Sequence, residues 1–421
     1  MTATADRPSA PVRNAPVQVG KLSERELLTM ISAIMALMAL AIDMMLPAFD
    51  DMRSEFGLAD GSNEVAQVIT VFFFGLAVAQ LFYGPLADRY GRKPILYSGI
   101  VIYLIGAVGS ALSPSLEWLL VSRFVWGVGA AGARVVATAI VRDVFAGTRM
   151  AKALSQIMAV FVLVPVIAPT LGAGIILVLP WRSIFWACVV WTIIVTVWSF
   201  RLPETLDPAN RRPLEARVIA DGYRTVASNR LTAGYTLATV FLQGVFTTYL
   251  ATSELIIGEI FGRGDQFPLV FGAVALLFGL GAFANGNLVG RIGLTRLTHR
   301  VAIMLLTGTV LLVVMSLASD GRPPFWLFMP LLGLSLSLFM FLMPNLNSAA
   351  MAPLGEVAGS ASSLTGAARM AGGAVLGGIA SGMVSDSVTP FAVAMLVFVA
   401  AAVACVFGAE RFDNGRNELM N

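Results

Sequence analysis

The sequence predicts an all-α membrane protein with twelve transmembrane helices in two pseudo-symmetric six-helix halves. Three observations support this fold class. Of the 421 residues, 57% are hydrophobic and only 13% are charged, whereas about 25% of the residues in a soluble domain are charged. Apolar runs of about 20 residues, the length that crosses a bilayer, recur along the whole chain. A short motif also occurs twice, once in each half.

The apolar runs place six helices before a polar segment and six after it. The first half, residues 27–200, holds crossings at 27–49, 64–86, 94–112, 117–141, 153–178 and 183–200. The second half, residues 231–408, holds crossings at 231–258, 267–289, 299–318, 324–346, 359–383 and 389–408.

Three polar segments lie outside the two halves. Residues 1–26 are rich in Pro, Ala and charged residues and lack the basic-then-apolar order of a cleaved signal peptide, so we expect a disordered cytoplasmic tail. Residues 201–230 carry six arginines and three prolines, which indicates a cytoplasmic linker between the halves. Residues 409–421 are expected to form a second cytoplasmic tail.

The distribution of basic residues predicts the orientation. Of the 28 Lys and Arg residues, 21 fall in segments, or at helix edges, that are cytoplasmic when the N-terminus is inside, four fall outside and three lie deep within helices. Because cytoplasmic loops of multi-pass proteins are enriched in Lys and Arg, we expect both termini in the cytoplasm and the chain in the cell inner (plasma) membrane. An odd helix count would place Arg411 and Arg416 outside, which favours twelve over eleven or thirteen.

Two short loops, one in each half, have similar sequences and form an internal repeat. GPLADRYGRKP at 84–94 is echoed 202 residues later by GNLVGRIGLTR at 286–296. Asp88 is the notable difference, since Gly290 occupies its place in the second copy. Two six-helix halves in tandem place a central substrate pathway at the interface between them.

Several other classes of function lack support in the sequence. The net charge of +3 comes from basic residues in short loops, which reports topology and not nucleic-acid binding. Cys188 and Cys405 lie in apolar segments and His299 has no partner nearby in sequence, so no metal site or disulfide framework is predicted. The chain has no G-x-x-x-x-G-K-[ST] loop for ATP, and we predict no cofactor.

The loop at residues 84–93 combines glycines, one carboxylate and three cations in a connection too short to adopt many conformations. It resembles the major facilitator superfamily, whose signature after helix 2 has the form G-x-L-a-D-r-x-G-r-k, and the resemblance covers about residues 27–408. It implies the major facilitator fold and a cytoplasmic gate that is closed when the protein faces outward. The alternative is a merely basic loop. The implied gate residues are Gly84, Asp88, Arg89, Gly91, Arg92, Lys93 and Arg142.

Three further stretches resemble drug:proton antiporters, in particular the bicyclomycin and chloramphenicol or florfenicol resistance exporters. They are IDMMLP at 42–47, RFVWGVGAAGA at 123–133 followed by VRD at 141–143, and PVIAPTLGAG at 165–174. The last matches the antiporter motif of helix 5, with Ala173 where a second consecutive glycine is common. The alternative is ordinary helix packing. The implied motif residues are Pro165, Pro169, Gly172 and Gly174.

Charged residues inside the predicted helices are the strongest functional candidates, because a charge at bilayer depth is costly unless it has a partner or a wet cavity. Asp43, late in the first helix, and Arg123, early in the fourth, have similar predicted depths in the outer half. We hypothesise that they pair and that Asp43 exchanges the coupling proton. The alternative is a purely structural ion pair.

A possible substrate cavity is predicted from Arg134, Gln243, Trp126 and Arg369. Arg134 lies about 16 Å along the helix from Arg123 and on nearly the same face. Three arginines against one clear carboxylate favour neutral or anionic substrates. Alternatively, Arg134 snorkels to the cytoplasm and Arg369 pairs with a helix terminus.

The resemblance therefore implies a proton-coupled secondary transporter that exports drugs or similar small organic molecules, phenicols among them, by alternating access. It is expected to be a monomer in the lipid bilayer, with small molecules and protons as partners and no nucleic acid. A proton-coupled importer or exporter of a specific metabolite is the alternative on the same fold. A membrane receptor or membrane-embedded enzyme is the alternative from a different class.

Overall fold

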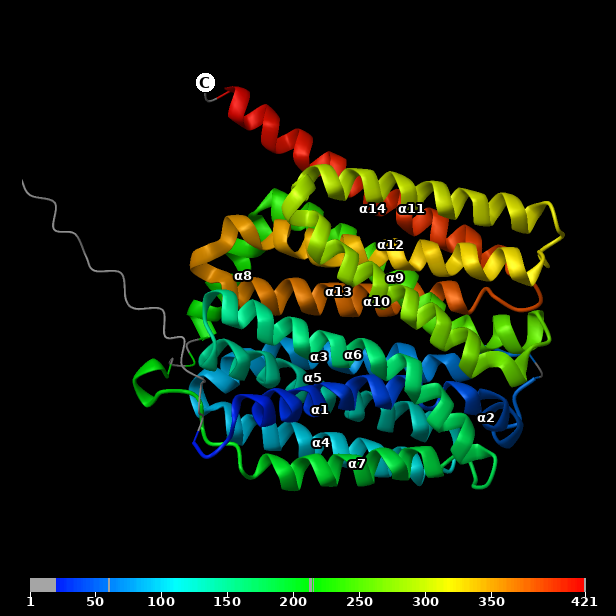
Figure 1. Ribbon diagram of the computed structural model, residues 1–421, viewed down its shortest axis with the longest axis horizontal. Helices are drawn as coiled ribbons and strands as arrows, with labels where there is room; N and C mark the ends of the chain where they lie inside the picture. The colour runs from blue at the N-terminus through cyan, green and yellow to red at the C-terminus, as the bar shows by residue number, and fades with distance from the viewer. Residues whose placement is uncertain (1–19, 60, 212–213, 215, 420–421) are drawn as a thin grey trace, which may run out of the picture.

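The computed structural model describes residues 20–59, 61–211, 214 and 216–419, and in these ranges all regular secondary structure is helical (Figure 1). The long helices are α1 (Glu24–Asp43), α3 (Gln67–Tyr90), α4 (Arg92–Ala111), α5 (Leu116–Val144), α6 (Gly147–Ile176), α7 (Ser183–Ser199), α9 (Arg230–Glu254), α10 (Phe267–Ile292), α11 (Leu294–Leu317), α12 (Phe325–Met351), α13 (Ala358–Ser381) and α14 (Thr389–Leu419). Two shorter helices are α2 (Phe49–Glu55) and α8 (Ala216–Ser228).

A long helix occupies most of each of the twelve predicted ranges. Ten described helical segments are long and apolar enough to cross a membrane, and α7, with 17 residues, is a shorter apolar helix. The helix α13 is 24 residues long but is not one of these ten. The last helix, α14, continues to Leu419, well beyond the predicted end at 408. Most of the predicted N-terminal tail lies outside the described residues.

The first predicted helix is broken. The range 27–49 was expected to be continuous, but α1 ends at Asp43, a 3₁₀ turn follows at Leu46–Ala48, and α2 begins at Phe49. Pro47 lies in the turn, where its missing N–H and fixed φ favour the start of a new helical segment. The break places the main-chain groups around Asp43 inside the protein.

The helices run roughly parallel and form two groups. Figure 1 shows α1, α4, α5 and α7 in the lower part of the view and α9, α11, α12 and α14 in the upper part, while α8 lies at the left end of the bundle and α2 at the right end. We call these the α8 end and the α2 end. Between the groups, α3 packs along α13 and α6 packs along α10.

Inside the first group, glycines let α5 approach its neighbours at backbone distance. A Cβ added at Gly127 would lie 2.1 Å from the carbonyl oxygen of Phe72, and one at Gly75 would lie 2.2 Å from that of Phe124. The helices α3 and α5 therefore touch main chain to main chain. Small residues at helix interfaces replace the hydrophobic driving force that lipid does not supply.

The helix α8 lies in the segment that was predicted only as a polar linker. It contacts both groups, since the Tyr223 hydroxyl donates to the Leu81 carbonyl of α3 at 2.9 Å and Val226 packs with Leu354 and Ala361 of the second group. The linker is thus attached to the α8 end of the bundle on both sides.

The two copies of the repeat have the same backbone conformation at one glycine. Gly91 joins α3 to α4 with φ 106° and ψ 160°, and Gly293 joins α10 to α11 with φ 88° and ψ 147°. Only glycine adopts this region readily. The two sites differ in their surroundings, because an added Cβ would lie 2.6 Å from Glu204 at Gly91 and would meet nothing within 4 Å at Gly293.

Replacing each of these glycines by alanine separates backbone strain from crowding. Strain of about 1–3 kcal/mol is expected at both sites, and Gly91→Ala adds the clash with Glu204. We expect both variants to unfold at lower temperature than the unmodified protein, and Gly91→Ala at the lower temperature of the two. Thermal unfolding of the purified proteins in one detergent measures this, and equal losses would contradict the role given to Glu204.

Candidate functional site

Asp43 lies at the break of the first transmembrane segment. It is the last residue of α1, and only 4% of its surface is exposed. Within the described ranges no ion pair joins it to a lysine or arginine. Tyr249 of α9 lies within electrostatic range of this carboxylate, and its buried hydroxyl has no hydrogen-bond partner there. Asp43 is therefore a buried carboxyl group within electrostatic range of the second group of helices.

Arg123 is fully buried, and its hydrogen bonds go to main-chain carbonyl groups. Its Nη1 donates to the carbonyl oxygen of Ala41 at 2.9 Å and its Nε donates to that of Val68 at 3.3 Å. The guanidinium carbon lies 4.6 Å from the ring centre of Phe72 and 4.8 Å from that of Trp126. The predicted ion pair with Asp43 is therefore absent from the described ion pairs. The last carbonyls of a helix lack intrahelical partners, and Arg123 supplies one to the broken end of α1.

The predicted antiporter motif contacts this break. A Cβ at Gly172 of α6 would lie 1.9 Å from the carbonyl oxygen of Met44, the residue after Asp43. The helix continues through Pro165 and Pro169. Gly174, two residues further on, would accept a Cβ with nothing within 4 Å. Of the two motif glycines, only Gly172 is required for close contact with the first segment.

This difference provides a matched pair of variants. We expect Gly172→Ala to displace the segment that carries Asp43 and to lower the unfolding temperature by several degrees, since overpacking costs about 1–3 kcal/mol. Gly174→Ala should behave like the unmodified protein. Thermal unfolding and substrate efflux from energised cells are the two measurements. Equal behaviour of the two variants would show that the contact with Met44 has no consequence.

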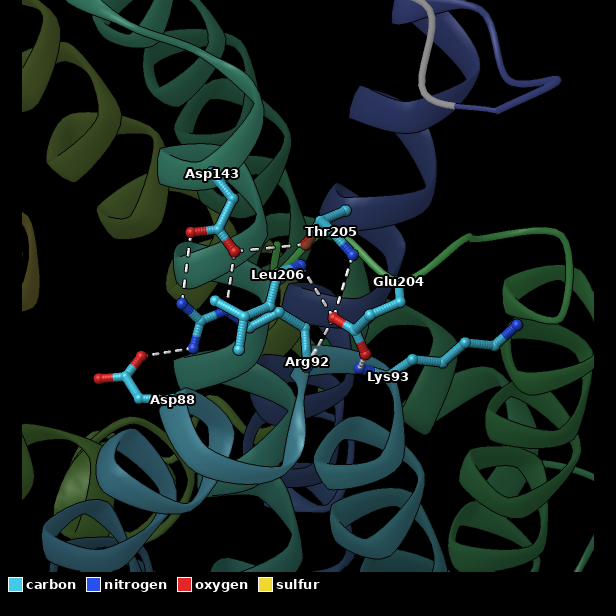
Figure 2. A network of polar contacts seen from close by, with 7 residues as sticks. All are labelled: Asp88, Arg92, Lys93, Asp143, Glu204, Thr205 and Leu206. Carbon is cyan, nitrogen blue, oxygen red and sulfur yellow. Dashed lines mark hydrogen bonds and ion pairs between the residues drawn. The ribbon is translucent and has the colours of Figure 1, made fainter. Parts of the chain in front are cut away.

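At the α8 end, the predicted gate loop forms a charged network with two other segments (Figure 2). Arg92 donates through Nη1 to Asp88 at 2.6 Å and through Nε to Asp143 of α5 at 2.7 Å. The Arg92 side chain is 5% exposed. This geometry ties the connection between α3 and α4 to the end of α5.

Glu204, which follows α7, caps α4 from 112 positions further along the chain. Its carboxylate accepts from the backbone N–H of Arg92 at 2.9 Å and of Lys93 at 3.1 Å, and from those of Thr205 and Leu206 at 3.0 Å each. The first N–H groups of a helix have no intrahelical acceptor. Partial burial acts to raise the pKa of Glu204, but these four N–H donors outweigh it and hold the pKa below its ordinary value.

The structure places the other predicted gate residues differently. Gly84 lies against the second group, since a Cβ there would lie 3.1 Å from the Ser363 hydroxyl of α13. Lys93 donates to the carbonyl of Phe200 at 3.1 Å, and Arg89 and Arg142 are exposed. The network of Arg92 therefore braces segments of the first group and, among the described residues, makes no bridge to the second.

Asp143 and Glu204 were missed from the sequence. Asp143 is the last residue of VRD at 141–143, next to the predicted Arg142, so its signal was present in the motif. Glu204 lies in a polar loop, and no local pattern connects it with the start of α4.

The lowered pKa of Glu204 predicts a pH-dependent contribution to stability. A carboxyl group whose pKa is depressed by folding stabilises the folded state above its unfolded pKa of about 4.3, and this stabilisation is lost as the pH falls through the folded value. Glu204→Gln should therefore unfold at a lower temperature than the unmodified protein at pH 7, and the difference should narrow below about pH 4. Asp221→Asn, an exposed position on α8, is the control. A difference that does not change with pH would contradict the capping role.

A cavity of about 480 Å³ opens between the two groups near the α8 end. Two of the four residues of the predicted substrate cavity, Arg134 of α5 and Arg369 of α13, are among the residues that line it. The other two predicted cavity residues lie elsewhere. Trp126 is fully buried against Tyr103 and Phe185, and Gln243 of α9 packs on Gly373 of α13. Their bulk packs helices together and does not line the cavity wall.

The α2 end is closed by charges. Arg53 of α2 donates to Glu254 of α9 at 3.0 Å and to Glu259 at 3.4 Å, and it also binds Asp50. Glu254 is itself buried, with only 5% of its surface exposed. The residues after it, Leu255–Ile260, form a π-helical turn, a feature often found at functional sites. The two groups are thus joined at this end by the buried ion pair between Arg53 and Glu254.

Parallel helices in two groups, ion-paired at one end and separated by a cavity at the other, define a multi-pass membrane transporter. The sequence model of the Major Facilitator Superfamily matches residues 31–377. The chain therefore belongs to the Major Facilitator Superfamily, a family of transporters and not of enzymes, whose members act on small molecules.

Three relatives narrow the comparison. The Bicyclomycin resistance protein homolog of Haemophilus influenzae is 30% identical over 387 residues, which cover 89% of this chain and 93% of that protein. The Uncharacterized MFS-type transporter YdgK of Bacillus subtilis is 30% identical over 409 residues, with 94% and 98% covered. Multidrug resistance protein MdtL of Escherichia coli is 32% identical over 241 residues, with 56% and 60% covered.

Solved structures share the fold at low identity. The D-xylose-proton symporter is 14% identical with a TM-score of 0.71, and the match covers 90% of this chain and 97% of that one. The human organic anion transporter MFSD10 is 21% identical with a TM-score of 0.64, covering 91% and 100%. At these identities the likeness concerns the fold alone.

Proposed function

We propose that this protein exports drugs or similar small organic molecules, phenicols among them, in exchange for protons. Two relatives named for resistance, to bicyclomycin and to multiple drugs, support export of such compounds. The single observation that supports proton coupling is Asp43, a buried carboxyl group at a helix break without an ion-pair partner in the described chain. Such a group can take up and release a proton without breaking a salt bridge.

Alternating access follows from the different states of the two ends. We assign the α8 end to the cytoplasm from the distribution of Lys and Arg. In this orientation the cavity opens to the cytoplasm, and the ion pairs of Arg53 close the outer side. In this proposal the twelve long helices all cross the inner membrane, in two halves of six that rock about the cavity. Both termini are cytoplasmic and the protein acts as a monomer.

Coupling in this proposal passes through the first segment. Gly172 holds the break of α1 at backbone contact, and Asp43 lies within electrostatic range of Tyr249 on α9 of the other half. Protonation removes the charge of Asp43 and changes how that surface packs against Tyr249. Arg123, which is bound to Ala41 two residues away, keeps the break in place.

Proton movement in everted membrane vesicles tests this proposal. We expect addition of chloramphenicol or florfenicol to evoke proton release from the vesicle interior, and we expect Asp43→Asn to abolish it because the amide cannot exchange a proton. Asp265→Asn, an exposed acidic residue in the loop before α10, is the matched control and should retain the full signal. A cationic dye and an anionic compound complete the panel.

Protein amount and monodispersity in detergent show whether each variant is folded. Full coupling in folded Asp43→Asn would refute the assigned role of Asp43. No response to any compound in the unmodified protein would favour the alternative of a dedicated metabolite carrier, and uptake of labelled compound by intact cells would establish an importer.

A further inference from the structure

The wall of the cavity at the α8 end carries an excess of positive charge. The described residues that line it include four arginines, Arg92, Arg134, Arg142 and Arg369, and one acidic residue, Asp88. Asp88 is already bound to Arg92, which in turn binds Asp143. Asp88 is therefore already neutralised by Arg92 and forms no ion pair with the remaining arginines of the wall.

Arg134 and Arg369 approach the same space from different halves. Arg134 lies on α5 and Arg369 on α13, and the charge of Arg134 acts on Arg369 across the cavity. Neither side chain forms an ion pair or hydrogen bond with another residue in the described part of the chain, and Nη1 of Arg134 is buried without any partner. Two like charges held near each other in a low-dielectric site repel, and binding of an opposite charge between them is favourable.

The rest of the wall offers neutral groups that can hydrogen-bond to a ligand. Thr138 and Asn347 line the cavity together with Ser360, Ser362 and Ser363. The carbonyl oxygen of the Gln80 side chain, also on the wall, is buried and has no donor among the described residues. A volume of about 480 Å³ is in the range of small-molecule sites.

We propose that this cavity binds an organic anion, with one carboxylate, phosphate or sulfonate group held between Arg134 and Arg369. Guanidinium groups suit such oxyanions because they present donors in a planar fork that matches two oxygens. The preferred cargo is thus a small organic molecule with an acidic head group and a body that the neutral wall accommodates, and neutral compounds such as phenicols are expected to bind in the same cavity more weakly. The inference rests on the proposed function, because it names the substrate class of the exporter.

The position of this site also separates the anion from the coupling residue. Arg134 is eleven residues after Arg123 on α5, so the two differ in depth by about 16 Å, and Arg123 marks the break of α1 near Asp43. The anion therefore binds near the cytoplasmic end, and Asp43 exchanges its proton deeper in the membrane. Substrate and proton do not compete for one carboxylate. Because the anion bridges α5 and α13, it draws the two halves together at the cytoplasmic end.

A matched trio of probes tests the charge preference. They are 4-phenylbutyrate, 4-phenylbutyramide and 4-phenylbutylamine, which share one carbon skeleton and carry an anionic, neutral or cationic head. Binding to the purified full-length protein at pH 7.5 is measured by calorimetry and by the shift in unfolding temperature. We expect the carboxylate to bind more tightly than the amide and the amine. Inorganic phosphate is included to detect binding of a small ion alone.

The same measurements are made on Arg134→Gln, Arg369→Gln and the double variant. Each single change should weaken carboxylate binding about tenfold or more, the usual scale for a hydrogen bond to a charged group, and leave amide binding unchanged. Arg134→Lys and Arg369→Lys, which keep the charge but not the fork, should lie in between. Arg296→Gln, an exposed arginine at the cytoplasmic end, is the control and should have no effect.

The proposal is overturned if the carboxylate binds no better than the amide, or if its preference survives in the folded double variant. Binding of phosphate as tight as that of the carboxylate would also overturn it, because the site would then hold an ion and not an organic cargo. Proton release in vesicles separates this outcome from failure of the exporter itself. Proton release evoked by neutral phenicols without carboxylate binding leaves export standing, whereas carboxylate binding without proton movement refutes proton coupling alone.

Discussion

A transmembrane helix that breaks inside the membrane must find partners for its last carbonyl groups, and this need organises the first half of the protein. Arg123 meets it by donating to Ala41, next to the end of α1, while it also donates to Val68 of α3. The buried guanidinium lies against Phe72 and Trp126, which in turn pack with Tyr103 and Phe185. Helices α1, α3, α4, α5 and α7 are all held around this one cation.

Because Arg123 donates its hydrogen bonds to main-chain carbonyls, Asp43 is a carboxyl group without an ion pair in the described chain. It lies within electrostatic range of Tyr249 of the opposite half, and Gly172 keeps the segment at backbone contact with α6. Helix packing and proton exchange therefore depend on the same short stretch. In the proposed exporter, a change in the charge of Asp43 can therefore alter the packing of both halves.

The two ends of the bundle use charge for different purposes. At the α2 end, Arg53 and Glu254 join the halves across their interface, and both are buried. At the α8 end, Arg92 joins Asp88 and Asp143 within one half, whereas Arg134 and Arg369 at the interface form no ion pair with any of the described residues. The first arrangement holds one end shut, whereas the second leaves a positively charged cavity for a ligand to fill.

The sequence by itself determined the membrane class, the positions of the long helices and the family, because bilayer thickness sets the length of apolar runs and the loop at 84–93 is a specific motif. It also identified Asp43, Arg134 and Arg369, since a charge within an apolar run stands out. Only the tertiary structure decided their partners. Depth along a helix can be counted from residue numbers, but the partners of a side chain depend on how helices rotate and where they break. Arg123 therefore binds the carbonyl of Ala41 instead of Asp43, and Glu204 caps a helix 112 residues away.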